Sequence, residues 1–91
     1  MYGHAIVVST SLVVLFSTSG RSPNLLRAAE VAGDLGARAV AVTGPAPNPL
    51  ADRCGHAVAV DASDTAAVQE AHQVVVHLLC VAIEAALGVA P

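Results

Sequence analysis

Four hydroxyl side chains lie within six residues of one another in the segment F-S-T-S-G-R-S, and they are the clearest candidates for chemistry in this sequence. They belong to Ser17, Thr18, Ser19 and Ser22. A phosphate group presents several oxygen atoms that accept hydrogen bonds, and clustered hydroxyls can donate to them. Gly20 allows a ligand to approach the backbone closely. The segment therefore predicts a phosphate-binding loop.

The elements on either side of this loop favour the same interpretation. Residues 12–16 (LVVLF) form a short apolar run, typical of a strand buried on both faces. Pro23 suits the first position of a helix, which we expect to end at Gly36. The hydroxyls would then lie at the amino end of a helix, where N–H groups and the helix dipole favour an anion. The alternative is a serine-rich turn that only caps the helix. The loop lacks a Gly-Lys-Ser/Thr motif, so a nucleoside triphosphate is not expected.

Apolar runs and helical patterns alternate along the rest of the chain, which is typical of an α/β fold. We expect strands over 38–42 and 57–60, one helical turn over 49–54, and a long helix from Ser63 or Asp64 to about Leu87. Residues 5–8 are expected to form a weak extra strand. The sequence therefore predicts an α/β fold, with a partial doubly wound parallel sheet of three or four strands and flanking helices. We divide the chain into an amino-terminal segment, 1–10, and one folded unit, 11–91.

The long helix carries a second set of polar side chains. Four of them fall within one sector of about 80° at 100° per residue: Gln69, Gln73, His77 and Glu84. His72 lies apart from this sector, and residues 74–83 are apolar nearly all round. Such a helix is buried, either within a domain or between subunits. A histidine in these surroundings needs a hydrogen bond or a metal. A core histidine bonded to a backbone carbonyl is the alternative to a functional role.

The composition excludes several classes of partner. Only 12% of the residues are charged, the net charge is −3 and there is no Lys, so direct nucleic-acid binding is not expected. Residues 5–16 and 74–87 are apolar but interrupted by polar side chains, and we interpret them as core rather than membrane segments. Two isolated cysteines in an acidic chain indicate a cytoplasmic protein. The 55% of apolar residues exceed what a small monomer can hide, which predicts that another chain covers part of the surface.

Taken in order, the motifs resemble the sugar isomerase (SIS) domain. The order is S-T-S-G-x-S between a strand and a helix, then V-x-V-T-G, then T-A-x-V-Q-E-x-H-x-x-x-x-H. The last motif is typical of the phosphoheptose isomerase branch, which interconverts sedoheptulose 7-phosphate and a manno-heptose 7-phosphate. The resemblance covers roughly residues 11–88, and so nearly the whole chain.

This resemblance implies roles for particular residues. It places the four hydroxyls of the loop on the substrate-binding loop of the family, and Gln69 beside the substrate. Gln69 and His77 fall on positions that contribute to a zinc site in metal-binding members, and His77 is also a candidate for proton transfer. Aldose–ketose isomerisation moves a proton between C1 and C2, which needs a base, an acid and a group that polarises the carbonyl.

The chain also departs from the family. Members are considerably longer, and their amino-terminal half carries a Gly-rich loop and the His and Glu that complete the site. Ala67 stands where heptose isomerases often have Arg. The chain thus resembles the carboxyl-terminal half of a SIS domain, and alone we expect it to lack half of the active site. We expect a sugar phosphate ligand and either a homo-oligomer or a complementary amino-terminal-half chain. The alternatives are a non-catalytic phosphosugar-sensing module and a protein-interaction module.

Overall fold

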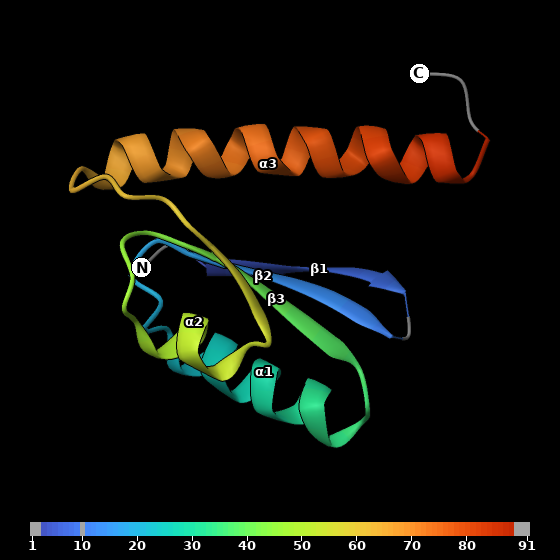
Figure 1. Cartoon of the computed structure of the whole chain (residues 1–91), viewed down its shortest axis with the longest axis horizontal. Coiled ribbons are helices and arrows are strands. Elements are labelled where there is room, and N and C mark those ends of the chain that lie inside the picture. Colours follow the sequence, from blue (N-terminus) through green and yellow to red (C-terminus); the bar gives the residue numbers. More distant parts are fainter. Residues whose placement is uncertain (1–2, 10, 89–91) are drawn as a thin grey trace.

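The part of the chain that the structure describes forms a single four-stranded sheet with helices on both faces. The computed structural model describes residues 3–9 and 11–88. The elements follow in the order β1 (Gly3–Ser9), β2 (Leu12–Ser17), α1 (Pro23–Asp34), β3 (Arg38–Thr43), α2 (Pro49–Arg53), β4 (His56–Ala59) and α3 (Thr65–Ala86). The strand order is β1-β2-β3-β4. Helices α1 and α2 cover one face, and α3 lies over the other (Figure 1). The α/β class predicted from the sequence is confirmed.

The sheet is mixed rather than wholly parallel. Strands β2 and β3 are parallel, with Leu12 opposite Arg38, and β3 and β4 are parallel as well. Strand β1 runs antiparallel to β2, with Gly3 opposite Ser17. Only residues 10 and 11 connect β1 to β2, whereas a parallel neighbour needs a crossover of about a dozen residues. The expected extra strand over 5–8 therefore exists, is longer than predicted, and closes a hairpin.

Two apolar cores lie on opposite faces of the sheet. On the face of α1 and α2, Leu15 and Ala41 pack with helix side chains that include Leu25 and Leu50. Cys54 belongs to this core, and its burial raises the pKa of the thiol. On the face of α3, the buried residues are Val14, Phe16 and Val42, and the side chains packed against them are Ile6, Val8, Val75, Val76 and Leu79. A strand that is apolar at successive positions, as β2 is, supplies side chains to both cores at once.

The helix ends follow the local sequence. Pro23 opens α1, and Gly36 follows the helix with φ of 77°, a conformation that favours glycine. The side chain of Asp64 caps α3 by accepting a hydrogen bond of 3.0 Å from the N–H of Ala66. Asp64, rather than Ser63, is therefore the N-cap residue of α3. Asn48 caps α2 in the same way.

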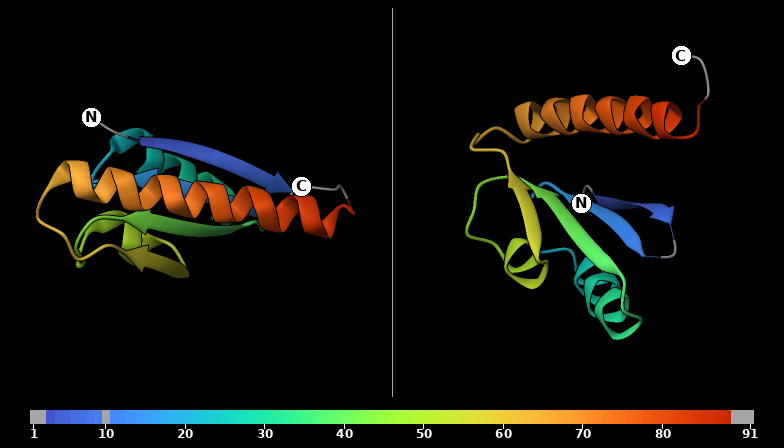
Figure 2. Two further views of the ribbon diagram at one scale, coloured as in Figure 1. Left: turned by 90° about the horizontal axis from the view of Figure 1, so that it is seen from above. Right: turned by 45° about the vertical axis from the view of Figure 1, so that its right-hand side comes forward.

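Helix α3 presents an apolar stripe away from the sheet. Seen from above, it runs over the middle of the sheet, with β1 on one side and β4 on the other (Figure 2). Val74, Leu78 and Val81 are 59%, 61% and 44% exposed. Within the described residues, α3 is the one helix with the length and apolar composition to cross a membrane. Those two properties by themselves are weak evidence for a membrane span. The expectation that residues 74–87 form core is met only in part, because the buried residues of α3 are Val68 and His72.

An apolar groove lies on the other face, at the edge formed by β1. Its volume is about 340 Å³, and β1, β2 and α1 line it with residues that include Val7, Val13, Val31 and Leu35. Val7 and Leu35 are 72% and 78% exposed. The alternation along β1 explains the groove, because His4, Ile6 and Val8 are half-buried while the residues between them are exposed.

Candidate functional site

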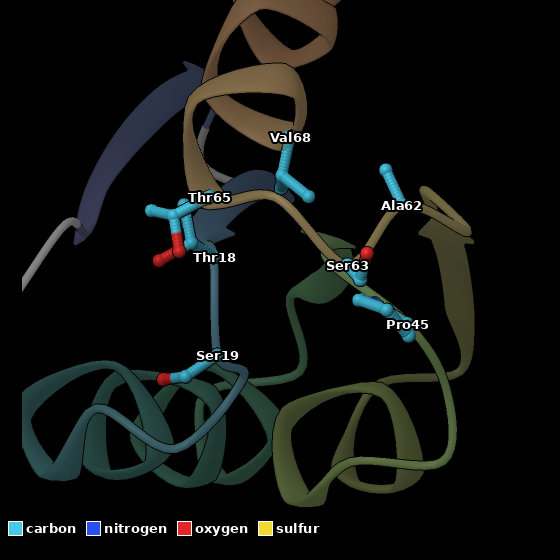
Figure 3. A pocket seen from close by; sticks show the side chains of 7 residues that line it. All are labelled: Thr18, Ser19, Pro45, Ala62, Ser63, Thr65 and Val68. Carbon is cyan, nitrogen blue, oxygen red and sulfur yellow. The ribbon is translucent and has the colours of Figure 1, made fainter.

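A cavity of about 150 Å³ lies at the carboxyl edge of the parallel strands (Figure 3). The loops after three strands and the start of α3 contribute its walls: Thr18, Ser19, Pro45, Ala62, Ser63, Thr65 and Val68. Open α/β sheets bind ligands at this edge because the strand ends and helix starts converge there. The cavity is lined largely by short side chains, and four of the seven carry a hydroxyl.

The structure divides the four hydroxyls of the predicted loop into two pairs. Thr18 and Ser19 line the cavity. Ser17 is fully buried, and its Oγ accepts a hydrogen bond of 3.0 Å from the N–H of Gly20, so it braces the loop from inside. Ser22 is buried at the N-cap of α1 and its side chain makes no capping hydrogen bond. Neither Ser17 nor Ser22 is among the residues that line the cavity.

The loop is positioned to favour an anion. Gly20 has φ of 67°, which lets the chain turn tightly between Ser19 and α1. The Oγ of Ser19 accepts a hydrogen bond of 3.1 Å from the N–H of Arg21. The first turn of α1 contains no acidic side chain, so nothing in that turn opposes the positive end of the helix dipole. The loop thus combines hydroxyl donors with a favourable field.

His72 holds α3 against the carboxyl edge of the sheet. Its ring is fully buried, and Nε2 lies 3.0 Å from the carbonyl oxygen of Thr43, so Nε2–H donates to that oxygen. The ring also meets Phe16 edge-on, with centroids 5.7 Å apart. His4 stacks on Phe16 with centroids 4.7 Å apart. A core histidine bonded to a carbonyl was the alternative drawn from the sequence, and His72 is such a residue.

Gln69 and His77 lie further along α3. Gln69 is half-buried and His77 is exposed. Neither residue lines the cavity, although the neighbouring Val68 does. They are separated by eight residues, about 12 Å along the helix axis. Among residues 3–9 and 11–88, no group of three or more His, Cys, Asp or Glu side chains comes together. A zinc site with four ligands is therefore not complete within this part of the chain.

Five lining residues were not predicted as site residues, and two of them are the apolar Ala62 and Val68. Ser63 and Thr65 flank the helix cap at Asp64, and Pro45 follows the motif V-x-V-T-G. A cap residue at the carboxyl edge of a parallel sheet is a signal that could have indicated Ser63 and Thr65, because the start of a helix after a strand lies at that edge. The position of Pro45 depends on the path of the loop after β3, which its sequence does not determine.

The comparison with protein families agrees with this arrangement. The family model of the SIS domain matches residues 2–87, which is nearly the entire chain. This chain belongs to the SIS domain family. The SIS domain of this chain has the serine loop between a strand and a helix, as the resemblance implied.

Curated relatives of this SIS domain carry the name phosphoheptose isomerase. One from Streptomyces coelicolor is 50% identical over 76 residues, which are 84% of this chain and 33% of that protein. One from Aneurinibacillus thermoaerophilus is 35% identical over 71 residues, which are 78% of this chain and 36% of that protein. One from Trichlorobacter lovleyi is 36% identical over 83 residues, which are 91% of this chain and 42% of that protein. The chain thus spans a third to two fifths of the length of these relatives.

Proposed function

We propose that this SIS domain binds the phosphate end of a sugar phosphate in the cavity between the β2–α1 loop and the start of α3. The observation that carries the proposal is the position of Thr18 and Ser19, whose side chains line a cavity at the carboxyl edge of the strands. Ser63 and Thr65 add two further hydroxyl residues to the lining, and Thr65 lies beside Thr18 (Figure 3). A phosphate accepts hydrogen bonds from several directions, which suits a cavity lined by several hydroxyls. The names of the relatives make a phosphoheptose the first ligand to test.

The lining of the cavity supports binding of the phosphate end of the sugar. Four of its seven lining residues carry a hydroxyl, which suits a phosphate. We propose that the carbon chain leaves the cavity. Gln69, Gln73 and His77 follow one another along the polar side of α3, and we propose that the sugar extends in their direction.

Catalysis is a separate proposal, and it requires another chain. His77 lies twelve residues beyond Thr65, about 18 Å along the helix axis, so it would meet the reacting end of the sugar rather than the phosphate. Its imidazole could transfer the proton between C1 and C2. An aldose–ketose isomerisation also needs a group that polarises the carbonyl. Gln69 and His77 are proposed ligands of a zinc ion that would supply this polarisation, and the further ligands would come from a partner.

The exposed apolar surfaces also support the need for another chain. The groove along β1 and the stripe on α3 leave Val7, Leu35, Val74 and Leu78 more than half exposed. We propose that either a second copy of this chain or a complementary amino-terminal-half chain covers them, and that the assembly is cytoplasmic. We propose that neither a membrane nor a nucleic acid takes part. The net charge of −3 and the presence of only four Arg and Lys side chains disfavour a nucleic acid.

Ligand titration tests the binding proposal directly. Sedoheptulose 7-phosphate should raise the melting temperature of the chain, and the double variant Thr18→Val, Ser19→Ala should lose this shift. Ser11→Ala is the matched control, because Ser11 is an exposed hydroxyl residue that precedes β2, at the opposite end of the strand from the loop. Sedoheptulose without phosphate should give no shift. A wild-type chain that shows no shift with millimolar sugar phosphate would leave the loop as a structural turn between β2 and α1 only.

A second candidate function is phosphosugar sensing without catalysis. The observation that favours it is an intact cavity beside an incomplete set of metal ligands in the described residues. A coupled isomerase assay with added zinc separates the two functions. Binding without turnover supports the sensing function for the chain alone. Turnover that disappears in His77→Ala would support an isomerase instead.

A further inference from the structure

We propose that Asn48 is a positioning residue that holds the phosphate-binding loop in shape. This inference rests on the proposed function of the cavity. Asn48 lies at the start of α2, outside the loop and outside the lining of the cavity. Its side chain is nevertheless 97% buried, with 3% of its surface exposed. A buried amide requires partners for both of its ends, and those partners show what it does.

The amide of Asn48 joins three segments at once. Its Oδ1 accepts a hydrogen bond of 2.9 Å from the N–H of Ala51 and so caps α2. Its Nδ2 donates to the Oγ1 of Thr43 at 2.9 Å and to the carbonyl oxygen of Pro45 at 3.3 Å. Capping uses only the oxygen. The two bonds made by the nitrogen fix the path of the chain between β3 and α2, and Pro45 on this path is a wall of the cavity.

This β3–α2 segment in turn holds the phosphate-binding loop from both sides of Ser19. The N–H of Gly44 donates to the carbonyl oxygen of Thr18 at 3.0 Å, and the N–H of Leu50 donates to that of Gly20 at 2.9 Å. Ser19, whose side chain lines the cavity, lies between these two fixed carbonyls. The orientation of the Ser19 hydroxyl therefore depends on a segment whose conformation Asn48 maintains.

The packing around Gly20 points to the same dependence. A Cβ atom added at Gly20 would overlap the Oδ1, Cγ and Cβ atoms of Asn48. The loop backbone thus lies directly against the Asn48 side chain, without room for any other residue. The contact with Asn48 and the hydrogen bonds from Gly44 and Leu50 together restrain the loop, as a binding site requires of its supporting residues.

The test compares the affinity for inorganic phosphate with stability in a set of variants. Asn48→Ser keeps a capping oxygen but removes both amide donors, and it introduces no charge. Thr43→Val removes the acceptor of the Asn48 hydrogen bond and leaves the cap of α2 unchanged, and it also removes the bond of 2.9 Å that the Thr43 hydroxyl donates to the carbonyl oxygen of Gly44. Each should raise the dissociation constant for phosphate by about tenfold, the effect of one weakened hydrogen bond to a charged group. The effect of the double variant should be smaller than the two single effects combined, because both variants remove the hydrogen bond between Asn48 and Thr43.

The control is Leu79→Ala, which reduces packing against Val14 and Phe16 on the other face of the sheet. It should lower stability to urea while leaving phosphate affinity unchanged within twofold. If Asn48→Ser and Thr43→Val also leave phosphate affinity unchanged, Asn48 only caps α2 and the proposal is overturned. If Asn48→Ser does not fold, Thr43→Val alone decides. A wild-type chain that binds no phosphate would overturn the proposed function itself, which this set distinguishes from failure of the Asn48 proposal.

Discussion

The imidazole of His72 and the carbonyl of Thr43 connect the first half of α3 to the last residue of β3. The donor Nε2 lies 3.0 Å from the oxygen, and both residues are fully buried. The same oxygen accepts a second hydrogen bond of 2.9 Å from the N–H of Val60. The other side chains that attach α3 to the sheet are mainly apolar, and apolar contacts are not directional. The bond from His72 therefore fixes the position of α3 on the sheet, and with it the position of Thr65 and Val68 at the cavity.

Removing the donor of His72 should cost a small but measurable part of the stability. His72→Phe keeps a buried ring, and the Thr43 carbonyl keeps its bond from Val60. We expect a loss of about 0.5–1.5 kcal/mol in the free energy of unfolding, measured by urea denaturation. His77→Phe is the matched control, because His77 is exposed on the same helix, and it should change stability by less than about 0.5 kcal/mol. Equal losses in the two variants would contradict the role assigned to His72.

Two glycines should respond in opposite directions to the same substitution. Gly20 has positive φ and faces Asn48, so Gly20→Ala introduces both backbone strain and a collision. We expect it to reduce stability by more than about 1 kcal/mol. Gly33 lies in α1 with no atom near the position of a Cβ, and Gly33→Ala should increase stability by about 0.5–1 kcal/mol. The melting temperatures of the two variants test this prediction. A Gly20→Ala variant with unchanged stability would contradict the tight contact between Gly20 and Asn48.

The apolar stripe on α3 should mediate association. Leu78 is 61% exposed, and burying a leucine side chain contributes about 1.5–3 kcal/mol. Leu78→Asp should therefore raise the dissociation constant of the assembly at least about tenfold. Gln73→Asp, on the exposed polar side of the helix, should have little effect. Val75 is unsuitable as a probe because it packs against the core of the sheet.

Sedimentation equilibrium at low micromolar concentration provides the measurement for these variants. The wild-type chain is expected to be larger than its monomer mass of 9.1 kDa. A folded wild-type species of 9.1 kDa would show that the stripe is not an interface between copies of this chain.

The sequence predicted the elements well because their signals are local. The apolar run at 12–16, Pro23 and Gly36 each act within one element, and β2 and α1 begin where these signals indicate. The hydroxyl loop was predicted from the same kind of signal, since a strand, a glycine and a helix start follow one another. The expected cap at Ser63 or Asp64 depends on one turn of chain, and Asp64 provides it.

Features that depend on distant contacts could not be predicted. The sequence offered four equivalent hydroxyls, and only the packed loop turns Ser17 inward and leaves Ser19 at the cavity. It also offered two histidines on one helix, and only the position of α3 over β3 buries His72 and exposes His77. Asn48 precedes the helical turn expected over 49–54, but its bond to Thr43 requires the fold of the loop after β3.

The most direct test of the central claim is to locate the bound ligand on the protein. Amide chemical-shift changes on titration with sedoheptulose 7-phosphate should be largest at residues 18–22 and 62–66, which surround the cavity. Inorganic phosphate should affect the same amides, because the phosphate end is the part held there. Changes at residues 5–7 and 31–35, along the apolar groove, or no saturable change at all, would contradict the account.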